Sequence, residues 1–238
     1  MAAVPQFEAF ELTPQTSSAI IAAAARTVCH AFSDDPLIRW LRPGKKSWSF
    51  IPPALMAWQK RRIYETMSSG RVFGIRNVSG VAIYDENARL PGVAFAYGPF
   101  KWKLWLSRLP TRLWLWLTAQ EADGSDQNRV ALMMAEHDAT MASLDHKLKA
   151  PKWYIEVVAV DPDLQGLGLG KQLLRHVLDV AGPASPVVLE STKESNIGFY
   201  NKMGFQLEHV MSITDGKDTA DESTVQMWAM IRESTKTM

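Results

Sequence analysis

The sequence predicts a fold of the α/β (α+β) class, in which strands and helices follow one another along the chain. Two observations carry this prediction. An apolar run from Val157 to Val160 stops just before Pro162, and a glycine-rich turn and a helical pattern follow. On both sides of this unit, alternating stretches are interspersed with longer segments whose apolar residues recur every three or four positions. These patterns indicate strands packed against amphipathic helices.

Length and composition narrow the class of protein. We expect a single domain over residues 1–238, although two small domains would also fit this length. A hydrophobic content of 47% is enough for a substantial core, and the net charge of +1 argues against a nucleic-acid partner. The lone cysteine, Cys29, excludes an internal disulfide and a cysteine-based zinc site. No His, Glu or Asp cluster has metal-ligand spacing, so no metal site is predicted.

The same features suggest where the protein acts. Residues 1–5 lack the charged and then apolar pattern of a signal peptide. No segment reaches the roughly 18 apolar residues that span a bilayer. We therefore expect a cytoplasmic protein, with a nuclear location left open, that is a monomer or a homodimer.

In the first half of the chain, turn residues separate the periodic segments. The predicted elements are a strand over 7–12, a helix capped near Ser17 that carries Ile20 to Phe32, a helix opened by Pro52-Pro53 and ended by Gly70, and strands over 71–76 and 81–84 joined by a hairpin through 77–80, with a loop over 85–92.

In the second half of the chain, segments with apolar residues at helical spacing are interspersed with segments that alternate like strands. The predicted elements are a helical region over 102–120 broken at Pro110, a polar linker over 121–126, a long helix with Val130, Met133, Met134, His137, Met141 and Leu144 on one face, a strand over 153–160, a helix carrying Leu173 to Leu178, a strand over 187–192, a short helix ended by Gly204, and two strands that alternate to Ile213 and from Val225 to Ile231.

The turn after the central strand has glycine at every second position, at Gly166, Gly168 and Gly170. Glycine lets backbone amides approach a ligand, and a helix N-terminus adds unsatisfied donors and partial positive charge. The turn therefore suits a phosphate or pyrophosphate group. Its spacing differs from the dinucleotide fingerprint, and it lacks the G-K-[ST] of a P-loop. A turn that only connects strand to helix is the alternative.

Two motifs resemble the Gcn5-related N-acetyltransferase (GNAT) superfamily. Gln165, Gly168 and Gly170 fill its Q/R-x-x-G-x-G/A acyl-CoA motif. Asn196 and Tyr200, followed by Gly204-Phe205, fill its N-x-x-x-Y helix and the G-F after it. The residues of these two motifs are most similar to those of the puromycin N-acetyltransferase-like branch. The resemblance covers about residues 152–207.

The resemblance implies a fold and an activity. The fold would be a mixed twisted β-sheet flanked by helices, with an acyl-CoA-binding core at about 152–207 and acceptor-side helices at about 14–150, some of them inserted before the cofactor half. The activity would be direct attack of an amine on the thioester of acetyl-CoA, the cosubstrate. We expect a primary amine of a small molecule as acceptor. A protein lysine or N-terminal acetyltransferase, and a non-catalytic acyl-CoA sensor, are the alternatives.

The resemblance also implies which residues contact acetyl-CoA. Main-chain groups of the central strand would line the pantetheine arm and polarise the thioester, the amides of the turn would hold the pyrophosphate, and Asn196 would bond the cofactor or cap its own helix. The implied cofactor contacts are Val158, Ala159, Val160, Gln165, Gly166, Leu167, Gly168, Leu169, Gly170, Lys171, Asn196 and Tyr200.

Three residues are candidates for catalysis. Tyr200 would protonate the leaving thiolate, unless it only packs one face of its helix. Glu156 on the central strand and Glu190 at the end of the next strand are equal candidates for the base. Either could instead bind a cationic substrate, and a mechanism in which neither is the base stays open. His137 is read as a hydrogen-bonded core residue.

A Trp-rich segment over 102–117 is too apolar for a single helix stripe. It contains Trp102, Trp105, Trp114 and Trp116. It could fill the core, line the acceptor pocket, or contact a membrane surface or a partner, because basic residues interrupt it. We favour the pocket wall, which would imply a partly hydrophobic amine. A membrane span is not expected, although interfacial contact stays possible in principle.

Overall fold

The computed structural model describes residues 6–43, 51–79, 84–99, 113, 124–216 and 223–235. Apart from Leu113, the predicted Trp-rich segment therefore lies outside the described residues. The chain forms two compact units. The first contains residues 1–32, 49–123 and 155–180, and the second contains residues 33–48, 124–154 and 181–238. No helix in the described ranges is both long and apolar enough to cross a membrane.

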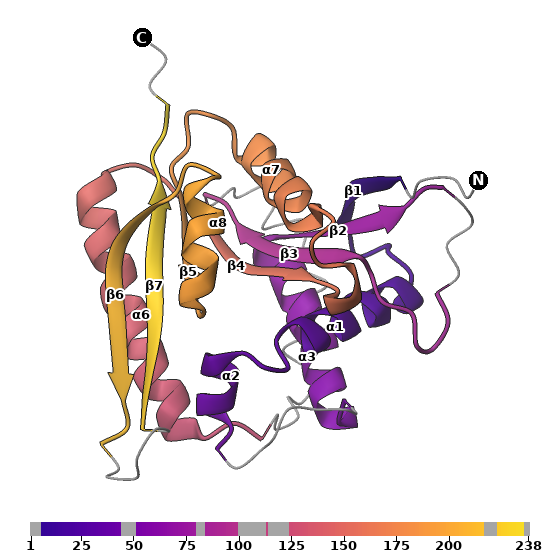
Figure 1. The fold of residues 1–238 in the computed structure, drawn as a ribbon, viewed down its shortest axis with the longest axis horizontal. Coiled ribbons are helices and arrows are strands. Elements are labelled where there is room, and N and C mark those ends of the chain that lie inside the picture. Colours follow the sequence, from indigo (N-terminus) through magenta and orange to yellow (C-terminus); the bar gives the residue numbers. More distant parts are fainter. Residues whose placement is uncertain are drawn as a thin grey trace. The chain divides into compact units, whose positions relative to one another are not determined.

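The first unit is a sheet with helices on both faces (Figure 1). β2 pairs antiparallel with β1 on one side and with β3 on the other. The elements of this unit are β1 (Phe7–Leu12), α1 (Ser18–Ala31), α3 (Pro53–Ser69), β2 (Arg71–Asn77), β3 (Gly92–Tyr97), most of β4 (Trp153–Val160), the 3₁₀ turn η1 (Pro162–Leu164) and α7 (Leu169–Ala181).

Side chains that alternate along β2 show which helices cover each face of this sheet. Val72 belongs to the apolar cluster that contains Ile63 of α3 and Val28 of α1. The next residue, Phe73, packs its ring edge-on against His176 of α7, with centroids 5.2 Å apart. Because successive side chains of a strand point to opposite faces, α1 and α3 cover one face of the sheet and α7 covers the other.

The second unit is built on β7, which pairs antiparallel with β5 and with β6. Trp153 and Tyr154, the first two residues of β4, also belong to it. Its remaining elements are α2 (Pro36–Leu41), α6 (Gln127–Leu148), β5 (Val187–Ser191), the 3₁₀ turn η2 (Glu194–Asn196), α8 (Ile197–Asn201), β6 (Gln206–Thr214) and β7 (Thr224–Arg232).

The long helix α6 packs on this second sheet (Figure 1). Its first half contacts Met211 and Met227 through Val130 and Met133, and its second half packs Leu144 against Val188 of β5. A buried ion pair fastens its start: Nε of Arg129 lies 2.8 Å from Oδ2 of Asp215, and Nη1 donates to the carbonyl of Trp40. This packing fixes which side chains of α6 face β5.

Most predicted elements are confirmed within these ranges. The predicted caps also hold, because Ser17 accepts from the amide of Ile20 and Gly70 ends α3. Two elements were missed. β3 is buried along nearly its whole length, so it shows no alternation, and α2 has only six residues. Tyr84, expected in a strand, lies outside any strand, and the rest of that predicted strand falls outside the described residues.

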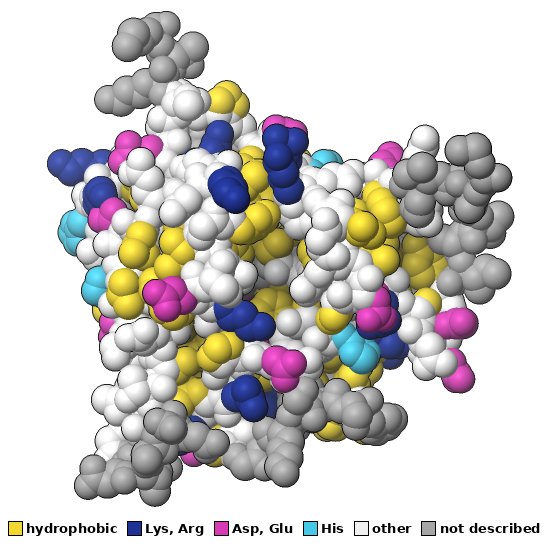
Figure 2. Space-filling model, viewed as in Figure 1, with side chains coloured by type: hydrophobic (Ala, Val, Ile, Leu, Met, Phe, Trp, Pro, Cys, Tyr) yellow, Lys and Arg dark blue, Asp and Glu magenta, His cyan; other side chains and the backbone are white. Residues whose placement is uncertain are grey.

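The surface carries both signs of charge. Figure 2 shows Lys and Arg side chains interspersed with Asp and Glu side chains across the described part of the face in view. Interspersed charges agree with the net charge of +1 and give no focused positive field on this face.

Candidate functional site

The turn after β4 is anchored at its start by charged residues. Asp161 is buried, its amide donates to the carbonyl of Pro91, and its carboxylate lies 3.0 Å from Nη1 of Arg89. The same guanidinium pairs with Asp163. Asp161 also accepts from the amide of Asp163, which starts the 3₁₀ turn η1. The chain therefore leaves the strand at a fixed angle before the glycines begin.

Gly166 and Gly168 adopt φ values of +84° and +78°, which L side chains rarely take. A Cβ atom placed on either glycine would meet nothing within 4 Å. Backbone conformation rather than crowding therefore demands glycine here, and the space beside both residues is open. Gly170 lies inside the first turn of α7.

The first turn of α7 leaves backbone donors for a ligand. Gln172 is the first residue of this helix whose amide donates to a backbone carbonyl behind it, that of Gly168, at 3.0 Å. The amides of Leu169, Gly170 and Lys171 precede it and have no intrahelical acceptor. An open groove of about 480 Å³ adjoins the turn, lined by Phe7, Glu8, Ala9, Gly168, Lys171, Gln172, Arg175, His176 and Asp179. The predicted pyrophosphate turn thus has donors and room.

The three predicted strand contacts differ in exposure. Ala159 is fully buried in the core of the first unit, whereas Val158 and Val160 are partly exposed. The carbonyl of Val160 accepts a long hydrogen bond of 3.5 Å from Nε2 of Gln165, so Gln165 folds back toward the strand end. Gln165 and Leu167 are exposed at the tip of the turn.

Tyr200 and Asn196 lie in the second unit. Tyr200 is buried, and its ring meets Phe199 and Phe205 edge-on. Burial raises the pKa of Tyr200 to about 12. α8 ends at Asn201, three residues before the predicted end at Gly204. Gly204, at φ +87°, turns Phe205 toward Tyr200. Asn196 is exposed and makes no capping hydrogen bond, so the capping role considered for it is wrong.

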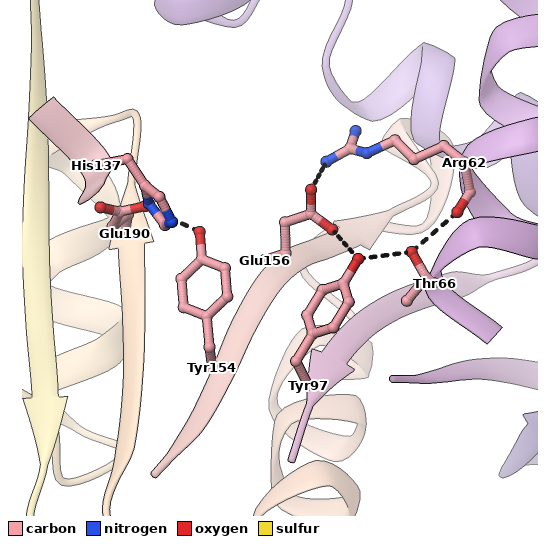
Figure 3. Close-up of polar contacts among 7 residues, drawn as sticks. All are labelled: Arg62, Thr66, Tyr97, His137, Tyr154, Glu156 and Glu190. Atoms are coloured by element: carbon pink, nitrogen blue, oxygen red, sulfur yellow. Dashed lines mark hydrogen bonds and ion pairs between the residues drawn. The ribbon is translucent and has the colours of Figure 1, made fainter. Parts of the chain in front are cut away.

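Glu156 is at the centre of a network in the first unit (Figure 3). Nη2 of Arg62 lies 2.6 Å from its Oε1, and the hydroxyl of Tyr97 donates to its Oε2 at 3.1 Å. Thr66 lies 3.0 Å from that hydroxyl. Burial, and then the charge of Glu156, raise the pKa of Tyr97, so this phenol stays a donor. Each oxygen of Glu156 therefore has a partner.

Glu190 is at the centre of a network in the second unit (Figure 3). Nδ1 of His137 lies 2.8 Å from its Oε2, and the hydroxyl of Tyr154 donates to the same oxygen at 2.9 Å. Only 4% of the Glu190 side chain is exposed, against 22% for His137. The other oxygen, Oε1, is buried and has no hydrogen-bond partner among the described residues.

Sequence reasoning found both carboxylates but missed their partners. Glu190 shares a strand face with Val188, and that face packs on α6, so Glu190 meets a helix that precedes it by more than 40 residues. The sequence predicts a hydrogen-bonded core residue at His137. Its ring does contact an acceptor, Glu190, but its side chain is partly exposed. The only available signal was a histidine on an otherwise apolar stripe.

With this geometry described, the chain can be compared with known proteins. Residues 99–205, just under half of the chain, match the model of the Acetyltransferase (GNAT) family. This match includes the glycine turn and the Asn196–Tyr200 helix. It supports membership of the GNAT superfamily, whereas the puromycin N-acetyltransferase-like branch is not confirmed.

Part of the chain is also similar in sequence to a curated protein. Over 62 residues the chain is 34% identical to the peptidyl-lysine N-acetyltransferase YjaB of Salmonella typhimurium, which covers 26% of this chain and 42% of that protein. The chain therefore matches less than half the length of this curated relative.

Solved structures match over nearly the whole chain. A Corynebacterium glutamicum protein described as histone acetyltransferase HPA2 and related acetyltransferase has a TM-score of 0.56 at 19% identity, with 97% of each chain covered. The arylalkylamine N-acetyltransferase 2 of Aedes aegypti has a TM-score of 0.57 at 14% identity, with 96% of this chain and 99% of that chain covered. The predicted fold, a mixed β-sheet flanked by helices, is confirmed by this likeness.

Proposed function

We propose that this protein is an acetyl-CoA-dependent N-acetyltransferase that acetylates a primary amine of a small molecule in a ternary complex. One observation carries the proposal. The turn that opens α7 has two glycines with positive φ and open space beside them, inside the region that matches the acetyltransferase family model. Side chains at those glycines would fill the space that a pyrophosphate needs, so the residues present fit acetyl-CoA.

In this proposal, the first unit holds the cosubstrate. The amides of residues 165–171 bind the pyrophosphate, and the main chain of Val158, Ala159 and Val160 lines the pantetheine arm. Acetyl-CoA supplies an activated acyl group. A backbone donor of the strand would stabilise the negative charge that develops on the thioester oxygen.

Tyr200 is the acid in this proposal. Tyr200 protonates the departing sulfur, and its raised pKa of about 12 keeps the phenol protonated at all physiological pH values. Asn196 is exposed and free of a capping bond, so its amide is available to the pantetheine amides. Glu156 and Glu190 remain the candidates for removing the acceptor's proton, and their different partners are the basis of the inference below.

A lysine side chain of a peptide is the second candidate acceptor. The observation that favours it is the 34% identity to a protein named as a peptidyl-lysine N-acetyltransferase, although that likeness covers only 62 residues. A lysine side chain and a small alkylamine present the same ammonium group, so the carboxylates alone would accept either.

Calorimetry with acetyl-CoA, followed by a thiol-release assay, tests the proposal. We expect binding of acetyl-CoA, and release of free thiol with at least one member of a panel of small primary amines. Thiol release only with lysine-containing peptides would favour the second candidate. Binding without release for any amine or peptide would favour a non-catalytic sensor, and no binding would overturn both enzyme proposals.

A further inference from the structure

The Glu190 network has the arrangement of an oriented base. Nδ1 of His137 lies 2.8 Å from Oε2 of Glu190. An ionised carboxylate only accepts hydrogen bonds, so with Glu190 ionised the proton of this contact is on Nδ1. A neutral imidazole protonated at Nδ1 has its lone pair on Nε2. Tyr154 donates to the same carboxylate oxygen, which fixes the carboxylate and, through it, the plane of the imidazole.

Exposure separates the roles within this network. The Glu190 side chain is 4% exposed, and the His137 side chain is 22% exposed. An acceptor amine can therefore reach the imidazole more readily than the carboxylate. In known catalytic sites, a buried carboxylate holds a more accessible histidine in the tautomer that can accept a proton. Glu190 and His137 have the same arrangement.

We propose that His137 is the general base of the acetyl transfer and that Glu190 is the residue that positions it. The inference rests on the proposed function and changes the role assigned to Glu190. His137 lies on α6, Glu190 on β5 and Tyr154 at the start of β4, all within the second unit.

The protons balance in this scheme. Nε2 of His137 takes one proton from the acceptor ammonium, and the freed lone pair on nitrogen forms the C–N bond to the acetyl carbon. The C–S bond breaks, and its electron pair leaves with sulfur. Tyr200 gives sulfur a proton and regains one from the acylated nitrogen. His137 then releases its proton to water, so one proton is produced for each acetyl group transferred.

The choice of acceptor makes a sharp test. An alkylamine has a pKa near that of lysine, about 10.4, and needs a base at neutral pH. A hydrazide of the same carbon skeleton is already neutral and does not need one. His137→Asn keeps a donor at the position of Nδ1 but lacks Nε2. We expect it to lower kcat/KM about 10²-fold for the alkylamine and less than about fivefold for the hydrazide.

A second variant tests the same role by rescue. His137→Ala should lose a comparable factor with the alkylamine, and added imidazole should restore part of the rate, because the side chain it replaces is partly exposed. Glu190→Gln should lower the rate about tenfold or more, by loosening the orientation of the imidazole. His146→Asn, an exposed histidine on the same helix, is the matched control and should change neither acceptor.

The outcomes separate this inference from the proposed function. Acetyl-CoA affinity and the melting temperature should stay at wild-type values in every variant. If His137→Asn loses the same factor with both acceptors, or if imidazole restores nothing to His137→Ala, the imidazole is structural and the inference is wrong while the acetyltransferase proposal stands. If the wild-type protein acetylates no amine, both are wrong.

Discussion

Glu156 in the first unit and Glu190 in the second each bond two side chains, but they distribute these partners differently. Glu156 has Arg62 on one oxygen and Tyr97 on the other. Glu190 has both partners on Oε2 and none, among the described residues, on Oε1. An arginine in a protein keeps its proton, whereas a histidine can gain or lose one near neutral pH. The comparison teaches that a carboxylate's partner, more than the carboxylate itself, decides whether a network can move protons.

The first prediction concerns the stability of the second unit and should show the largest effect. Arg129→Met removes the buried cation that pairs with Asp215, whose side chain is fully buried. We expect a loss of about 3–5 kcal/mol in the free energy of unfolding, measured by urea denaturation. Arg61→Met, which breaks the more exposed pair with Glu65 in the first unit, is the control and should cost less than about 1 kcal/mol. Equal losses would contradict the role of burial.

The second prediction concerns the acid of the proposed reaction. Tyr200→Phe keeps the ring between Phe199 and Phe205 and removes the hydroxyl. It should lower kcat about 10²-fold with acetyl-CoA affinity nearly unchanged, measured by thiol release and calorimetry. Turnover at the wild-type rate in this variant would exclude Tyr200 as the acid, provided that chemistry limits the rate.

The pKa of Tyr200 adds a pH dependence to that prediction. Because its folded pKa is raised from 10 to about 12, the wild-type rate should show no fall from tyrosine ionisation up to about pH 11. The same shift makes Tyr200 contribute stability that is complete below pH 10 and is lost as the pH rises from 10 to about 12. Unfolding curves of wild type and Tyr200→Phe across this range would measure the difference.

The third prediction assigns cosubstrate binding to the first unit. Gly168→Val places a branched side chain in the open space beside the turn. We expect acetyl-CoA affinity to fall at least about 30-fold, or roughly 2 kcal/mol, by calorimetry. Gly182→Val is the matched control, because Gly182 has a similar φ of +80° and equally open surroundings beyond the other end of α7. Similar losses of affinity in both would mean that strain, and not the position, is responsible.

The fourth prediction is the smallest and addresses Glu156 directly. Glu156→Gln leaves an amide beside Arg62 and Tyr97, in a network whose charged groups are 22% and 26% exposed. We expect kcat/KM to change less than about fivefold, because a partly exposed ion pair is worth about 1 kcal/mol or less. A loss as large as that of Glu190→Gln would make Glu156 an equal candidate for the base again.

The sequence predicted those parts of the fold whose signal is local. α7 follows from Leu173 to Leu178 at helical spacing, and the turn before it follows from its glycines. β3 could not be predicted in the same way, because its residues from Gly92 to Ala96 are all buried and show no alternation. α2 is short, although Asp35 before Pro36 was a readable start signal, and Asp35 does cap the helix.

The candidate site also contains residues with a local sequence signal and residues without one. Gln165, Gly168, Asn196 and Tyr200 stand in short motifs and could be named because these motifs resemble those of a known family. His137 could not, since its partner Glu190 is 53 positions away, and Arg62 is 94 positions from Glu156. Such pairs exist only once the chain is folded, and a single sequence contains no signal that joins them.

The positive φ values of Gly166 and Gly168 also have a consequence that concerns chirality. Their backbones occupy the region that is natural for residues of the opposite chirality, and glycine is accepted only because it is achiral. A D-alanine introduced at either position by chemical ligation would fit the backbone without strain, and it would restrict the unfolded chain more than glycine does. The turn could therefore be stiffened by a mirror-image residue at a place where no residue from the genetic code except glycine fits without strain.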